Sequence, residues 1–204
     1  MKKIIFLGDS ITDAYHNLGV DIRGLGNGYV ECICRKMEET GKEVKILNRG
    51  HDGFTAAGLQ KRLLQDCILQ QPDIVSILIG CNDVGIMMNT GKTLEQQRFK
   101  EIYEEIIVEI QNETEADIIC MAPFIFPRPE KYLNWIPEIR SAEAIIKKTA
   151  QKYGLTFLPL HDELQKAAKK CGYNDITVDG IHLTRKGAEV VADLWMKSFG
   201  ERVN

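Results

Sequence analysis

The sequence has no cysteine arrangement that is typical of a metal site or a disulfide framework. Six cysteines occur among 204 residues, and Cys32 and Cys34 are the only close pair. A structural zinc site needs paired CxxC-type spacing, which this pair does not have. A chain of this length can build a hydrophobic core without covalent cross-links, and no secretory signal is expected. We therefore predict that all six thiols are free.

Long hydrophobic runs are also absent. The apolar residues 4–7 follow two lysines, as in an export signal, but the run ends at Gly8. An export signal needs roughly 7 to 15 apolar residues, and a membrane span needs roughly 18. No other stretch of the sequence approaches that length. The sequence therefore predicts a cytoplasmic protein that does not enter a membrane.

The chain carries no excess of positive charge. Its 26 lysines and arginines stand against 29 aspartates and glutamates, which gives a net charge of −3. A protein that neutralises a phosphate backbone needs a basic excess, so nucleic acid is not an expected partner. Hydrophobic residues make up 44% of the chain and charged residues 27%, as in ordinary folded domains. At about 150 residues per domain, we expect residues 1–204 to form one domain.

Short apolar runs alternate with longer amphipathic segments along the chain. The runs predict strands at residues 3–7, 44–47, 74–79, 118–121 and 156–158. Runs rich in Ile, Val and Leu suit strands that are buried on both faces of a parallel sheet. Apolar residues recur at helical spacing in residues 99–110 and 190–195, and Thr184 is placed to cap the second of these helices. The pattern predicts an α/β fold with helices on both faces of a parallel sheet.

Small, polar and titratable residues follow the predicted strands. They gather in residues 8–12, 48–55, 80–83 and, just before the last helix, 179–182. Ligands of open α/β sheets bind outside the carboxyl ends of the strands. These four segments are therefore expected to meet at one edge of the sheet and to form the functional site there.

Three of these residues match the parts of a nucleophilic site. Gly8 permits a tight turn that presents the hydroxyl of Ser10 at the sheet edge. A serine needs a base to become a nucleophile, and His182 is the candidate base. Asp179 stands three residues before His182, where its carboxylate can accept the Nδ1 proton and fix the tautomer. Taken singly each residue is typical of a turn, but together they favour nucleophilic catalysis.

Acyl transfer also requires hydrogen-bond donors for the negatively charged oxygen of the intermediate. The side-chain amide of Asn82 and the backbone N–H groups of Gly53 and Ser10 can supply them. His51 and Asp52 lie directly before Gly53, and we expect them to shape that loop. A role as a second base is the alternative for this pair.

The four segments resemble the four conserved blocks of the SGNH hydrolases, also called GDSL esterases or lipases. Their order and spacing agree, and the resemblance extends from residue 3 to residue 199. It implies a three-layer α/β/α, flavodoxin-like fold with a five-stranded parallel sheet. It also implies hydrolysis of carboxylic esters without a metal or an organic cofactor. The residues that it assigns are a triad of Ser10, Asp179 and His182, and an oxyanion hole of Ser10, Gly53 and Asn82.

Two positions in these blocks bear on the match to the family. Gly53 matches the family pattern better than Gly50, because Thr55 follows Gly53 after one intervening residue. Cys81 stands where the family commonly has a small or hydroxyl-bearing residue, and this departure changes no expected role.

The resemblance also suggests the class of substrate. We expect a small-molecule ester with a short acyl group, and an acetylated carbohydrate is the first candidate. About 200 residues leave little room for a lid over the site, so an open site is expected. Asp9, Phe124 and Trp135 are candidate substrate contacts. The segment 123–135 that holds the two aromatic residues is equally typical of a proline-stiffened connection whose rings pack on the core.

Two other functions remain open from the sequence. One is a non-catalytic sugar- or phosphate-binding protein on the same layout, because fold alone does not decide function. The other is a metallophosphoesterase that uses Asp9, Asp83 and His182 as ligands. A two-metal site needs more His and Asp ligands, and the four histidines of this chain form no H-x-H or D-x-H pair.

Overall fold

The computed structural model describes residues 1–18 and 22–200 of the chain. In these residues five parallel strands form one sheet with the order β2-β1-β3-β4-β5. The strands are β1 (Lys2–Gly8), β2 (Val44–Gly50), β3 (Ile74–Leu78), β4 (Asp117–Met121) and β5 (Thr156–Leu158). This is the order of flavodoxin-like sheets. The predicted fold class is confirmed.

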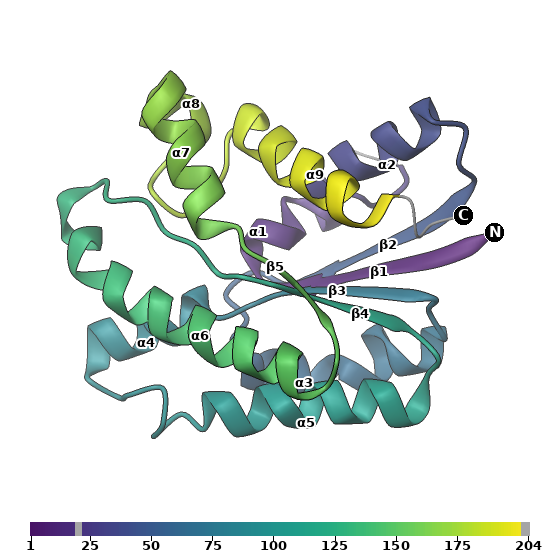
Figure 1. The fold of residues 1–204 in the computed structure, drawn as a ribbon, viewed down its shortest axis with the longest axis horizontal. Coiled ribbons are helices and arrows are strands. Elements are labelled where there is room, and N and C mark those ends of the chain that lie inside the picture. Colours follow the sequence, from purple (N-terminus) through teal and green to yellow (C-terminus); the bar gives the residue numbers. More distant parts are fainter. Residues whose placement is uncertain (19–21, 201–204) are drawn as a thin grey trace.

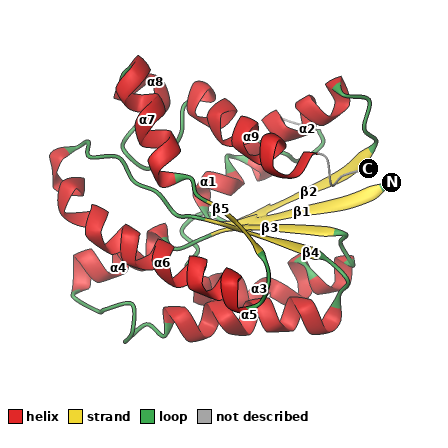
Figure 2. Cartoon of the chain, in the orientation of Figure 1, coloured by secondary structure: helices red, strands yellow, loops and turns green. Residues whose placement is uncertain are grey.

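Two layers of helices cover the sheet (Figures 1 and 2). One layer holds α1 (Ser10–Asp13), α2 (Tyr29–Glu39), α7 (His161–Cys171), α8 (Tyr173–Ile176) and α9 (Arg185–Phe199). The other holds α3 (Ala56–Asp66), α4 (Cys81–Thr90), α5 (Phe99–Glu113) and α6 (Ile136–Lys152). Short 3-10 helices lie at η1 (His16–Leu18), η2 (Ile68–Gln70) and η3 (Glu130–Trp135).

Residues of each strand alternate between the two layers, because successive side chains of a strand point to opposite faces. Ile4 and Phe6 pack with α2 and α9, whereas Ile5 and Leu7 pack with α3 and α5. None of these four side chains is more than 1% exposed. Burial on both faces explains why the strands are continuous apolar runs in the sequence.

The second strand is longer than predicted. It continues through Asn48 to Gly50, which lies opposite Gly8 on β1. A Cβ at Gly50 would overlap the backbone of Thr12 and Asp13 in α1. The close packing of α1 on the strand ends therefore requires a glycine at position 50.

The structure also bears on the predicted helix cap, the cysteines and the expected lack of a membrane span. Thr184 caps α9, and its hydroxyl accepts a 3.1 Å hydrogen bond from the backbone N–H of Gly187. All six cysteines are free, as predicted. Among the described residues, none of the helices has the length and apolar character that a membrane crossing requires.

Trp195 fastens α9 to the sheet. Its side chain is fully buried, and its ring packs against Phe6 and Phe199. The indole Nε1 donates a 2.9 Å hydrogen bond to Oγ of Ser76 on β3. A buried indole N–H needs an acceptor, which explains a serine in an otherwise apolar strand. This contact sets the position of the helix that follows residues 179–182.

Replacing Trp195 by Phe is expected to lower the free energy of unfolding by about 2 to 4 kcal/mol, because it opens a cavity and leaves the Ser76 hydroxyl unpaired. Urea unfolding followed by circular dichroism measures the change. The double variant W195F/S76A should cost less than the sum of the single variants, since the same hydrogen bond is lost in both. Strictly additive costs would show that this bond does not contribute.

Candidate active site

Ser10 begins α1 directly beyond the end of β1. Asp9 caps the helix, and its Oδ1 accepts a 3.0 Å hydrogen bond from the backbone N–H of Ile11. Gly8 lets α1 approach the sheet, because a Cβ there would overlap the side chain of Thr12. The first N–H groups of a helix have no acceptor within the helix. The backbone N–H of Ser10 is therefore available to a ligand.

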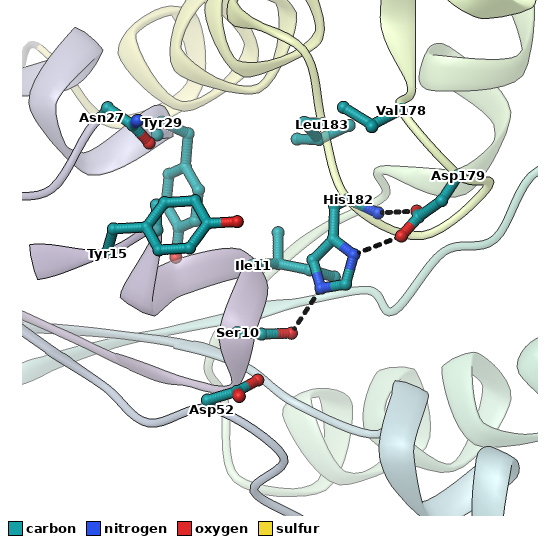
Figure 3. A pocket seen from close by; sticks show the side chains of 12 residues that line it. Ser10, Ile11, Tyr15, Asn27, Tyr29, Asp52, Val178, Asp179, His182 and Leu183 are labelled. Atoms are coloured by element: carbon teal, nitrogen blue, oxygen red, sulfur yellow. Dashed lines mark hydrogen bonds and ion pairs between the residues drawn. The ribbon is translucent and has the colours of Figure 1, made fainter.

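Ser10, His182 and Asp179 form a chain of hydrogen bonds (Figure 3). Ser10 Oγ lies 2.9 Å from His182 Nε2, and His182 Nδ1 lies 2.7 Å from Asp179 Oδ2. When the carboxylate accepts the Nδ1 proton, Nε2 is left as the acceptor for the hydroxyl proton. The structure thus brings together the three residues that the sequence singled out, in an arrangement that can activate a serine hydroxyl.

The loop between α8 and α9 holds the Asp179 carboxylate in place. Its Oδ1 accepts hydrogen bonds from the backbone N–H groups of Ile181 (2.9 Å) and His182 (2.8 Å). Partial burial alone would raise the pKa of Asp179, but the hydrogen bonds from the His182 side chain and from the backbone outweigh it. They hold the pKa below its ordinary value. The carboxylate that orients the imidazole therefore stays charged.

Gly180 joins this loop to the segment that follows β4. Its φ is +97°, and a Cβ at this position would overlap the carbonyl oxygen of Arg128. The carbonyl of Gly180 accepts a 2.8 Å hydrogen bond from the backbone N–H of Phe126. This part of the segment 123–135 is therefore a connection that supports the loop of Asp179 and His182.

Asn82 and Gly53 line one depression of the surface together with Trp135 and Ile181. Asn82 lies in the first turn of α4, and its Nδ2 donates a 2.9 Å hydrogen bond to the carbonyl of Phe54. An amide nitrogen carries two N–H groups, so the second remains available. Gly53 is exposed and has a φ of +71°. Both predicted donors therefore lie at the same surface.

Gly50 is not an alternative to Gly53 as a donor. Gly50 is buried, and its backbone N–H already donates a 2.9 Å hydrogen bond to Oδ1 of Asn48. The structure thus separates two glycines that only a family pattern distinguished in the sequence.

Two buried carboxyl groups lie behind this surface. Asp9 is 1% exposed and Asp83 is 3% exposed. Both oxygens of Asp83 lie 3.2 Å from the backbone N–H of Ala56, the first residue of α3. Burial raises the pKa of Asp9 to about 7, to which the charge of Asp83 adds, and burial also raises the pKa of Asp83 to about 6. The contact of Asp83 with α3 had no signal in the sequence.

Two of the three expected substrate contacts lie inside the protein, so the prediction for them is wrong. Asp9 is enclosed because its carboxyl group caps α1. Phe124 is 1% exposed and packs edge-on against Phe126, with the ring centroids 5.9 Å apart. It fills the core at the end of β4, where an apolar ring gains most from burial. Trp135 is half-buried and does line the depression of Gly53 and Asn82.

Two of the three metal ligands that a metallophosphoesterase would need here are hydrogen-bonded to the protein backbone. Asp9 and Asp83 accept hydrogen bonds from the backbone of Ile11 and Ala56. In the part of the chain that the structure describes, no three His, Cys, Asp or Glu side chains converge on one point.

The raised pKa of Asp9 predicts a pH-dependent effect of Asp9→Asn, which keeps a capping side chain. The unfolded chain ionises Asp9 near 3.8, whereas the folded protein keeps the proton up to about pH 7. The contribution of Asp9 to the free energy of unfolding therefore falls as pH rises through this window. The free energy of unfolding of the variant, measured relative to that of the wild type, should therefore rise by roughly 2 kcal/mol between pH 5 and pH 8. Urea unfolding at both pH values tests this, and a constant difference would contradict it.

Comparison with known proteins identifies the family. The model of the GDSL-like Lipase/Acylhydrolase family matches residues 6–190. An acetylxylan esterase from Geobacillus stearothermophilus is 27% identical over 210 residues, which cover 98% of this chain and 94% of that protein. The crystal structure of a GDSL-like lipase from Parabacteroides merdae has a TM-score of 0.89 and 26% identity, over 98% of this chain and 95% of the other. A crystal structure of an acetylxylan esterase from Geobacillus stearothermophilus has a TM-score of 0.83 at 23% identity, over 98% and 94% of the two chains. The match over most of its length shows that this chain belongs to the GDSL-like Lipase/Acylhydrolase family.

Proposed function

We propose that the protein is a serine esterase that hydrolyses acetyl or other short-chain esters of a soluble, carbohydrate-like alcohol. The observation that carries the proposal is the hydrogen-bonded chain from Ser10 through His182 to Asp179. Family membership supports ester hydrolysis as the reaction, and the similarity to an acetylxylan esterase supports an acetylated sugar as the substrate.

In the proposed reaction, Ser10 Oγ attacks the ester carbonyl while His182 Nε2 takes its proton. The imidazolium that forms is stabilised by Asp179 and then gives the proton to the leaving alcohol, which leaves the acyl group on Ser10. A water molecule, deprotonated by the same imidazole, attacks this acyl-enzyme. The acid is released and the serine hydroxyl is restored.

The carbonyl oxygen becomes negatively charged in both steps. The backbone N–H groups of Ser10 and Gly53 and the second amide N–H of Asn82 are the proposed donors. Such donors accelerate a reaction when their direction is set before the charge develops. The hydrogen bond from Asn82 to the Phe54 carbonyl restrains the amide in this way.

Two depressions beside the proposed triad suggest where the two parts of the ester lie. His182 must return its proton to the leaving alcohol, and it lines a depression of about 330 Å³ together with Tyr15, Asn27 and Asp52. We assign the alcohol to this side. Tyr15 is 62% exposed, so its ring offers a flat apolar surface to a sugar. The acyl group then extends toward the depression of Gly53, Asn82 and Trp135.

Substitutions of the proposed catalytic residues should lower the rate of ester hydrolysis by different factors. Ser10→Ala and His182→Ala are expected to remove most hydrolysis of p-nitrophenyl acetate, because the nucleophile or its base is lost. Asn82→Ala should lower kcat by roughly 10² to 10³, the usual effect of losing one oxyanion donor. Steady-state kinetics on purified variants gives both values, with circular dichroism as the control for folding.

Wild-type activity of Ser10→Ala would show that the serine is not the nucleophile. Labelling by a fluorophosphonate probe distinguishes the remaining alternatives, since a non-catalytic sugar or phosphate binder should not react with it. Hydrolysis that is lost in EDTA and restored by a divalent cation would instead favour a metal-dependent phosphoesterase.

Trp135→Ala should change acyl preference more than stability. The indole narrows the depression on the acyl side and lies 3.5 Å from where a Cβ of Gly85 would be. Its removal is expected to raise kcat/KM for p-nitrophenyl butyrate and hexanoate several-fold relative to the acetate. Leu133→Ala is a matched control, because Leu133 is 48% exposed on the same short helix η3 and lines a separate depression. A lower melting temperature with an unchanged ester profile would refute the assignment.

A further inference from the structure

A second histidine contacts the turn that carries Gly53. His51 follows the end of β2, and its backbone N–H donates a 3.0 Å hydrogen bond to the carbonyl of Gly8. The N–H of Phe54 donates to the carbonyl of His51 at 3.2 Å and closes a four-residue turn over residues 51–54. Gly53 is the third residue of this turn and has a φ of +71°. Type II turns require a positive φ at this position.

The ring of His51 is held from two sides. Its Nε2 lies 2.7 Å from Oδ2 of Asp66, at the end of α3. Its face stacks on the ring of Phe54, with centroids 4.5 Å apart and an interplanar angle of 28°. Asp66 is only 8% exposed and also accepts hydrogen bonds from Arg62, one helical turn earlier. The imidazole therefore connects the turn to a rigid helix.

Phe54 links the His51 ring to the side-chain amide of Asn82. Its carbonyl oxygen accepts the 2.9 Å hydrogen bond from Asn82 Nδ2. Its ring lies over Gly58 in α3, where an added Cβ would be 3.2 Å from the ring. Phe54 thus lies between the His51 imidazole and the Asn82 amide.

In the direction where a Cβ would lie, Gly53 faces open space among the described residues. A Cβ built on Gly53 would meet no atom of the described residues within 4 Å. Glycine has the widest backbone freedom of any residue, so its N–H direction must be set by its neighbours. A donor that is free to turn away loses its value to the transition state.

We propose that His51 and Asp66 are a positioning pair that aims the Gly53 N–H and the Asn82 amide at the ester oxygen. The inference rests on the proposed esterase function and adds two residues to it. His51 acts through the turn and does not exchange a proton with substrate. Its ring faces Asp66 and Phe54, whereas Ser10 is hydrogen-bonded to His182.

Two single variants and their combination test the bond between His51 and Asp66 while an aromatic or imidazole ring stays on Phe54. His51→Phe keeps an aromatic ring on Phe54 but removes the bond to Asp66, and Asp66→Ala removes the same bond from the other side. Each should lower kcat/KM for p-nitrophenyl acetate about tenfold, which is part of the 10² to 10³ that one complete donor supplies. The double variant should be no slower than the slower single variant, because both lose one interaction.

Inhibition by n-butylboronic acid tests whether this loss lies in the oxyanion hole. A boronic acid forms a tetrahedral adduct with a catalytic serine, and one of its oxygens takes the place of the oxyanion. Its Ki should rise across the variants by the same factor by which kcat/KM falls. His51→Gln retains an N–H donor for Asp66. Its kcat/KM and its Ki should therefore lie between those of His51→Phe and those of the wild type.

Leu63→Val provides the control for stability. Leu63 is buried on the same helix as Asp66, and its truncation should lower the melting temperature without changing kcat/KM or Ki. The proposal is overturned if His51→Phe stays within twofold of the wild type, or if kcat/KM falls while Ki is unchanged. A loss as large as that of His182→Ala would also overturn it, because His51 would then take part in the reaction. Retained activity in Ser10→Ala would instead refute the esterase mechanism itself.

Discussion

The hydrogen bond between Ser10 and His182 joins residues that are 172 positions apart in the chain. Its 2.9 Å length depends on two independent placements. Ser10 is placed by β1 and by the Asp9 cap on α1, whereas His182 is placed by a loop that Asp179 folds and that α9 continues. Local hydrogen bonds fix the segment of Ser10 and the loop of His182 separately. The packing of α1 and α9 on the same sheet then brings the two side chains within hydrogen-bond distance.

Glycines and buried carboxyl groups have different structural roles at this edge of the sheet. Gly8, Gly50 and Gly180 are needed for space, since a Cβ at each would overlap a neighbouring segment. Asp9 and Asp83 are buried, and their oxygens accept hydrogen bonds from the backbone N–H groups of Ile11 in α1 and Ala56 in α3. The proposed chemistry therefore takes place on a surface whose shape is set by close packing and by helix capping behind it.

The fold and the residues of the proposed site could be predicted because their signals are local. Apolar runs mark the strands, and Ser10, Asp179 and His182 stand next to the ends of predicted elements. Burial could not be predicted in the same way. Asp9 and Phe124 lie beside functional segments in the sequence, but their side chains turn inward, and only the three-dimensional path of the chain determines that direction.

The sequence by itself determined the fold class, and it marked Ser10 and His182 as the candidate nucleophile and the candidate base. Periodicity and strand-end residues act over a few positions, so they can be seen without coordinates. The tertiary structure decided that the Gly50 N–H is bonded to Asn48, that Trp135 lines one depression with Gly53 and Asn82, and that His51 meets Asp66 on α3. These facts depend on contacts between segments that are distant in the chain, and no local pattern encodes such contacts.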